Sequence, residues 1–174
     1  MSSQEVHHCQ EHKQLRYVTA KSLTTYRWFD NQALEAAQFY VNLFPRSRLG
    51  DISYYHADAQ MPKGSVLTLE FEIFGQPFAA LNGGPQFLHT EAVSIQVSCD
   101  GRKEVDCLWY ALISDGGQES QCGWCKDRWG VNWQIIPDEL GRALRGLDGY
   151  DSSYAFRAMM KMSKIIVTDL RPTR

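Results

Sequence analysis

One order of predicted elements occurs twice along the chain, and this repeat constrains the fold more than any other feature. In the first half, the apolar periodicity predicts a strand, a helix and three more strands, at residues 23–29, 33–43, 50–56, 65–74 and 77–82. In the second half the same order returns, at residues 92–99, 102–114, 118–127 and 131–136, where a break at Cys122-Gly123 would divide 118–127 into two strands. We therefore expect an α+β protein of two βαβββ modules that pair about a pseudo-twofold axis.

The segments outside the repeat differ in character. Residues 1–20 are polar and without period, which predicts a flexible N-terminal tail. Residues 21–137 form the paired domain, with modules at about 21–85 and 91–137, and residues 138–174 form a C-terminal helical extension. In that extension we expect helices at 138–145 and 152–162 and a short strand or helix at 164–170. Methionines near its end favour irregular packing, against this chain or a second subunit: Met159, Met160 and Met162.

Composition excludes several classes of function. The net charge of −2 gives no indication of nucleic-acid binding or of an anionic membrane surface. The sequence has no apolar run of about 18 residues, so we expect no membrane span, and its N-terminus lacks the apolar core of a secretory signal. Five cysteines, an odd number, indicate free thiols in a reducing cytoplasm.

The tail carries a potential metal cluster. Ordering a tail around a metal costs about 1–2 kcal/mol per residue in backbone entropy, so we expect these residues to be an unstructured polar segment. The cluster comprises His7, His8, Cys9, Glu11 and His12.

The stretch from Cys122 to Pro137 holds two cysteines and three tryptophans, and its alternation predicts two strands around a turn at 127–130. Pro137 is expected to end the second strand. Cys122-x-x-Cys125 suggests a redox pair, but a reactive pair needs a helix N-terminus, and here a turn and a strand follow. On an extended strand the two thiols would face opposite ways, which favours two buried, unreactive cysteines.

Several motifs, spread from about residue 23 to 170, occur together in this chain. They are Trp28-Phe-Asp30, Glu35-Ala-Ala-Gln-Phe-Tyr40, Phe44-Pro45, Gly64-Ser-Val-Leu-Thr-Leu-Glu-Phe71, Leu81-Asn-Gly-Gly-Pro85, Cys122-Gly-Trp-Cys-Lys-Asp-Arg-Trp-Gly130 and Met159-Met-Lys-Met162. With these motifs the chain resembles the PhnB-like branch, named 3-demethylubiquinone-9 3-methyltransferase, of the vicinal oxygen chelate superfamily. That superfamily includes glyoxalase I, bleomycin-resistance proteins and extradiol dioxygenases.

The resemblance implies a curled mixed β-sheet cup, glyoxalase-like, that encloses a small-molecule cavity, and it implies a homodimer. In metal-dependent members the first and last strands of each module supply the ligands. The matching positions here are Thr24 or Thr25, Asn82, Glu91 or Ala92, and Gln134. Hydroxyl and amide oxygens are weak ligands for zinc or iron, so we expect no metal-binding residues and leave the cofactor unknown.

Strand alternation and the resemblance together predict the residues that line the cup. Glu91 is the only candidate general base. The predicted cavity residues are amides, hydroxyls and aromatic rings, which suit a weakly polar small molecule, although each tryptophan could equally be core. They are Thr24, Tyr26, Trp28, Asn82, Trp124, Trp129, Asn132 and Gln134.

Three functions follow as hypotheses. The first is a small-molecule cavity protein, which could be an enzyme on a small organic substrate. The second is a non-catalytic protein that sequesters a compound, as bleomycin-resistance members do. The third is the methyltransferase of the family name, which the residues do not support: Gly83-Gly84 is followed by Pro85 and no helical period, so it reads as a tight turn at the cavity rim.

Overall fold

A computed structural model of the chain describes residues 21–57 and 61–172. The predicted tail and its histidine cluster lie outside the described residues. The elements follow the predicted order, with β1 at Thr25–Phe29, α2 at Ala33–Leu43, β2 at Arg48–Tyr54, β3 at Val66–Ile73, β4 at Gln76–Asn82, β5 at Ile95–Cys99, α3 at Gly101–Ile113, η1 at Ser114–Gly116, β6 at Gln118–Glu119, β7 at Trp124–Lys126, β8 at Asn132–Pro137, α4 at Asp138–Leu144, α5 at Ser152–Met159 and η2 at Val167–Leu170.

The strands form two mixed four-stranded sheets with the same order, β1-β4-β3-β2 in the first and β5-β8-β7-β6 in the second. In each sheet the first strand lies parallel to the last, and the remaining pairs are antiparallel. The predicted α+β class with two βαβββ modules is confirmed. The two sheets remain separate and do not close into a barrel.

Two boundaries differ from the prediction for a physical reason. The strand predicted at 118–127 is split into β6 and β7, because Cys122 and Gly123 both have positive φ, 58° and 85°. A residue in that region cannot continue a strand, and the interruption expected at this place is present. β5 begins at Ile95 rather than at residue 92, because its parallel pairing with β8 begins only at Trp133.

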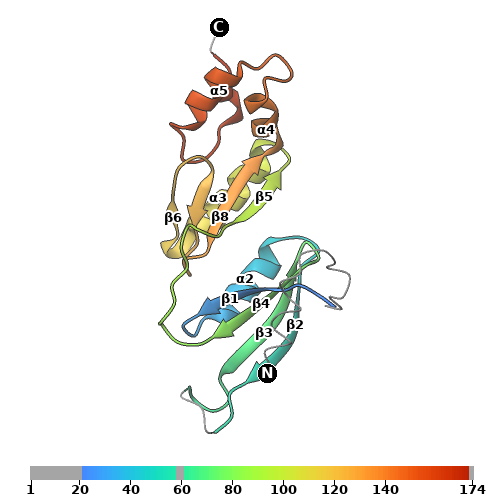
Figure 1. Cartoon of the computed structure of the whole chain (residues 1–174), viewed down its shortest axis with the longest axis vertical. Coiled ribbons are helices and arrows are strands. Elements are labelled where there is room, and N and C mark those ends of the chain that lie inside the picture. The colour runs from blue at the N-terminus through green and yellow to red at the C-terminus, as the bar shows by residue number, and fades with distance from the viewer. Residues whose placement is uncertain (1–20, 58–60, 173–174) are drawn as a thin grey trace, which may run out of the picture.

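The modules meet through the helix-covered sides of their sheets. Tyr40 of α2 lies 5.2 Å from the Trp133 ring of β8, and Phe44, just after α2, stacks on the same ring at 5.3 Å. Both modules share one apolar core. Figure 1 shows α2 between the first sheet and the second module. The opposite faces of the sheets, which we call the open faces, therefore point away from each other.

A buried carboxylate joins the modules. Asp127, in the turn before β8, is 3% exposed. Its Oδ2 accepts hydrogen bonds from the Tyr40 hydroxyl at 2.7 Å and from Trp133 Nε1 at 2.8 Å. Its Oδ1 accepts from the backbone amides of Trp129 and Val131, each at 3.0 Å. One side chain thus fixes the turn, the last strand and the helix of the other module.

The C-terminal extension packs on the second module. Its own small core joins α4, α5 and η2. The backbone carbonyls of Met162 and Ser163 accept hydrogen bonds from the amides of Cys122 and Gly123, at 2.8 and 2.7 Å, which satisfies the donors left free where the strand is interrupted. Residues 167–170 form a 3-10 helix. Among the described residues, none of the helices has the length and apolar character needed to cross a membrane.

We predict that Asp127→Asn lowers the free energy of unfolding by about 3 kcal/mol or more, because an amide cannot accept from all four donors and its own NH2 faces two of them. Tyr40→Phe removes one donor and should cost about 1.5–3 kcal/mol. Urea unfolding followed by tryptophan fluorescence measures both. A loss below about 0.5 kcal/mol for Asp127→Asn would show that the carboxylate is not what holds the modules together.

Candidate functional site: a cavity between the modules

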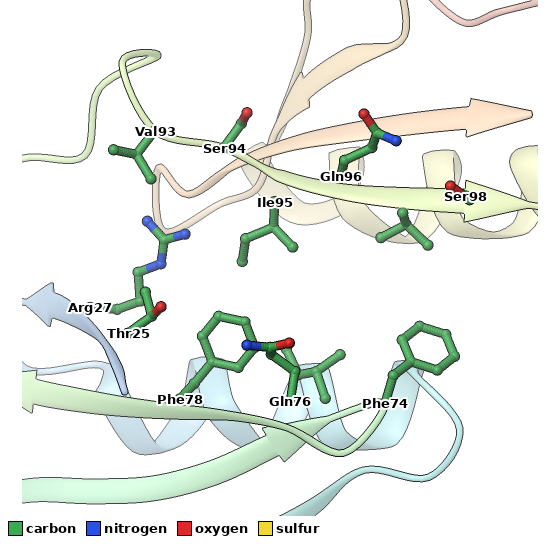
Figure 2. Close-up of a pocket in the computed structure, with 12 residues that line it drawn as sticks. Thr25, Arg27, Phe74, Gln76, Phe78, Val93, Ser94, Ile95, Gln96 and Ser98 are labelled. Carbon is green, nitrogen blue, oxygen red and sulfur yellow. The ribbon is translucent and has the colours of Figure 1, made fainter. Parts of the chain in front are cut away.

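A cavity of about 590 Å³ lies between the two sheets, on the side that α2 and α3 cover. From the first module it is lined by β1 and by the β3–β4 hairpin, and from the second by β5 and the residues before it. Figure 2 shows Ile95 pointing from β5 toward Phe78 on β4. The lining residues are Thr25, Arg27, Ile73, Phe74, Gln76, Phe78, Val93, Ser94, Ile95, Gln96, Val97 and Ser98.

The sequence brings these side chains inward by alternation. On β1, Thr25, Arg27 and Phe29 share the α2 side, because Thr25 pairs with Phe78 and Phe78 stacks on Phe71, at 5.4 Å, in the core beneath α2. The α2 side of β1 therefore carries a cation beside Phe29, a core aromatic.

Arg27 is the only charged residue among those that line the cavity. It is 8% exposed, and Figure 2 shows its guanidinium reaching toward the segment that carries Val93 and Ser94. Its Nε is buried without a hydrogen-bond partner, and no described residue forms an ion pair with it within 4.0 Å. Burial lowers the pKa of Arg27, while the nearby Tyr40 and Asp127 raise it.

Two further titratable groups lie close to Arg27. Burial, and then the charge of Arg27, lower the pKa of His89, whose Nε2 is also buried without a partner and whose ring contacts Phe29. Burial raises the pKa of the Asp127 carboxyl more than its hydrogen bonds lower it. At the module boundary the charge of Arg27 thus acts on the pKa of His89, and Asp127 acts on the pKa of Arg27.

Four of the predicted site residues lie at the open face of the second sheet or at its edge. Gln134, Asn132 and Trp124 share that face by register, and Gln134 Nε2 donates to Ser94 Oγ at 2.8 Å. Glu91 lies at the edge of this open face, where it forms an ion pair of 2.8 Å with Lys126, a residue of the same face. The hydrogen bond from Lys126 is the largest of the effects that lower the pKa of Glu91.

The remaining predicted residues lie elsewhere. The open face of the first sheet carries Tyr26, 62% exposed, and Trp28, whose Nε1 donates to the Gly84 carbonyl at 2.8 Å. Thr24 is exposed just before β1. None of the nine predicted catalytic and cavity residues lines the cavity between the modules, whereas Thr25, the alternative to Thr24 at the family's metal position, does.

Two of the predicted site residues, Asn82 and Trp129, make structural contacts on the helix-covered side. Asn82, on β4, caps the N-terminus of α2, because its Oδ1 accepts a hydrogen bond of 2.8 Å from the Ala33 amide. Its Nδ2 donates a hydrogen bond to the Val66 carbonyl. Trp129 packs between Phe39 and Arg128, whose guanidinium lies 4.3 Å from its ring. Their role in a cavity stays a prediction.

The glycine turn is explained by packing. Gly84 has a φ of 88°, as the tight turn requires, and at Gly83 a Cβ would lie 2.2 Å from the Trp28 ring. No helix follows, and neither glycine lines the cavity.

Of the two cysteines predicted to be buried, Cys125 is buried and Cys122 is partly exposed. Cys125 is 1% exposed, and burial raises its pKa to about 12. All four cysteines in the described part of the chain are free. A thiol with so high a pKa is a poor nucleophile at neutral pH.

Within residues 21–57 and 61–172, no three His, Cys, Asp or Glu side chains converge as metal ligands would. The residues that match the family's metal positions also fail to converge, because Asn82 lies on the helix-covered side and Gln134 on an open face.

Sequence reasoning missed Arg27 and the lining of β5. The alternation of residues 23–29 contained a signal for Arg27, since it shares a face with the apolar Phe29. No local signal identifies Ile95 and Val97 as lining residues, because they face the cavity only once the modules pack.

The paired βαβββ modules have the strand order expected of a glyoxalase-like fold. A family model described as 3-demethylubiquinone-9 3-methyltransferase matches residues 21–136. The chain belongs to this PhnB-like family. No curated protein sequence gives a match to the chain.

Solved structures agree with this assignment. A PhnB protein from Bacillus cereus is 29% identical, with a TM-score of 0.62 over 67% of this chain and 99% of that chain. Protein PA1353 from Pseudomonas aeruginosa is 20% identical, with a TM-score of 0.55 over 68% of this chain and 100% of that chain, which shows the shared fold.

We predict that stability falls as the pH is lowered from about 7.5 to about 5.5, with a slope of at most about 1.4 kcal/mol per pH unit from His89. The sign follows from its lowered pKa: the unfolded chain binds the proton first, so acid favours unfolding. Urea midpoints at several pH values measure the slope. His89→Gln should flatten it and the exposed His56→Gln should not; equal slopes in both variants would contradict the assignment.

Proposed function

We propose that this protein binds a small organic molecule in the cavity between its modules. The observation that carries the proposal is the cavity itself: its volume of about 590 Å³ lies within the range of ligand pockets, about 300–1,000 Å³. Its lining combines apolar side chains with a few polar groups, as such pockets commonly do. Binding without catalysis is sufficient to explain these features, and it corresponds to the sequestering hypothesis.

Catalysis by Glu91 stays a prediction. Its carboxylate is 64% exposed, paired with Lys126, and has a lowered pKa, so it would be a weak base. The methyltransferase activity in the family name has no support from the glycine turn, which opens no helix.

We further propose a cytoplasmic homodimer. The open faces that carry Tyr26 and Gln134 point away from each other within one chain, so a cup between them needs the open face of a second copy. Tyr26 is a large side chain left 62% exposed on such a face. The free cysteines support a reducing compartment.

The cavity is tested by filling it. Gln76→Trp adds an indole to an exposed position that lines the cavity, and Gln118→Trp adds the same group to an exposed strand remote from it. We expect hits from a fragment library, detected by saturation-transfer NMR, to be lost in the first variant and kept in the second. Fragments that bind both variants alike would place the ligand elsewhere, and a library without hits would contradict the proposal.

The dimer is tested by light scattering after gel filtration. We expect a mass of about twice the 19.9 kDa chain, and Tyr26→Glu should shift it toward the monomer because a charge would be buried in the interface. Tyr110→Glu, at a tyrosine 58% exposed on α3, is the matched control. A wild-type monomer at all concentrations would refute the proposal.

A further inference from the structure

We propose that the ligand of the cavity is an organic acid, whose carboxylate is bound by Arg27 and whose apolar body fills the space beside it. This inference rests on the proposed function and specifies the chemical class of the ligand. It follows from the hydrogen-bonding capacity that Arg27 leaves unused and from the distribution of polarity around the cavity.

Arg27 is a buried cation without a direct partner. It is 8% exposed, and none of its guanidinium nitrogens forms a hydrogen bond with a described residue, although Nε is fully buried. Burying a charge is costly unless it is paired, so a guanidinium kept in this position indicates an anion that is supplied from outside the fold. A planar guanidinium binds a carboxylate through parallel hydrogen bonds.

Large apolar side chains lie on opposite sides of the cavity, with Gln76 among them. Figure 2 shows Phe74 and Phe78 on one side and Ile95 on the other, with Arg27 at one end. A ligand with charge at one end and a ring or branched chain at the other matches this arrangement. No acidic side chain lines the cavity in the described part of the chain, so a ligand anion meets no like charge there.

Asp127 is the competing explanation for the charge of Arg27. It acts on Arg27 at long range, but both of its oxygens already accept two hydrogen bonds each, from Tyr40, Trp133 and two backbone amides. If Asp127 were the true partner, removal of Arg27 would leave a buried anion and destabilise the protein. If Arg27 serves a ligand, its removal should leave the free protein at least as stable.

The experiment compares isosteric probes on the full chain at neutral pH. 4-Methylbenzoate and 4-methylbenzamide differ in charge but hardly in shape, and 4-methylpentanoate and its amide repeat the comparison with an aliphatic body. Titration by NMR or calorimetry should show each acid binding about tenfold or more tightly than its amide, as expected for hydrogen bonds to a charged group. Arg27→Met should remove that preference while leaving the amides unaffected, and Arg27→Lys should retain part of it.

Controls separate the possible failures. Arg102→Met removes an exposed arginine of α3 and should change nothing. Urea midpoints should show Arg27→Met no less stable than wild type. Equal binding of acids and amides, or a destabilised Arg27→Met variant that keeps the preference, would overturn the inference but leave the proposed cavity intact. Absence of all binding, with Gln76→Trp indistinguishable from wild type, would overturn the proposed function itself.

Discussion

The hydrogen bonds to Asp127 are the interaction on which the arrangement of the two modules depends. Four donors converge on one buried carboxylate, two from the turn backbone, one from β8 and one from α2 of the other module. A βαβββ module alone leaves the outer surface of its helix uncovered. Tyr40 closes that gap because its ring packs on Trp133 and its hydroxyl reaches Asp127. The polar contact fixes the orientation that the aromatic packing alone would leave loose.

This packing determines where ligands can bind. Because the modules meet through their helix-covered sides, the space that remains between the sheets becomes the cavity beside Arg27, and the open faces turn outward. Two different surfaces thus carry polar and aromatic side chains: the partly open cavity between the modules and the exposed sheet faces. The first is complete in one chain, whereas the second requires another copy to become enclosed.

The family assignment and the site chemistry carry different information. The family model and the Bacillus cereus structure establish the fold and the lineage. The activity in the family name concerns a chemistry for which this chain shows no glycine-rich loop that opens a helix. The buried Arg27, which has no ion-pair partner among the described residues, instead supports our proposal of a ligand with a negative charge.

The sequence by itself determined the elements and their order. Periodicity located α2 at its observed bounds, the interruption near Gly123 and the end of the last strand at Pro137, because these depend on local conformational preference. The repeat and the motifs identified the family. Only the tertiary structure decided which strand faces form a site. Alternation groups Tyr26 with Trp28 and Arg27 with Phe29, but it cannot say which group faces a cavity, since that depends on how α2 packs against Trp133, a residue about ninety positions away along the chain.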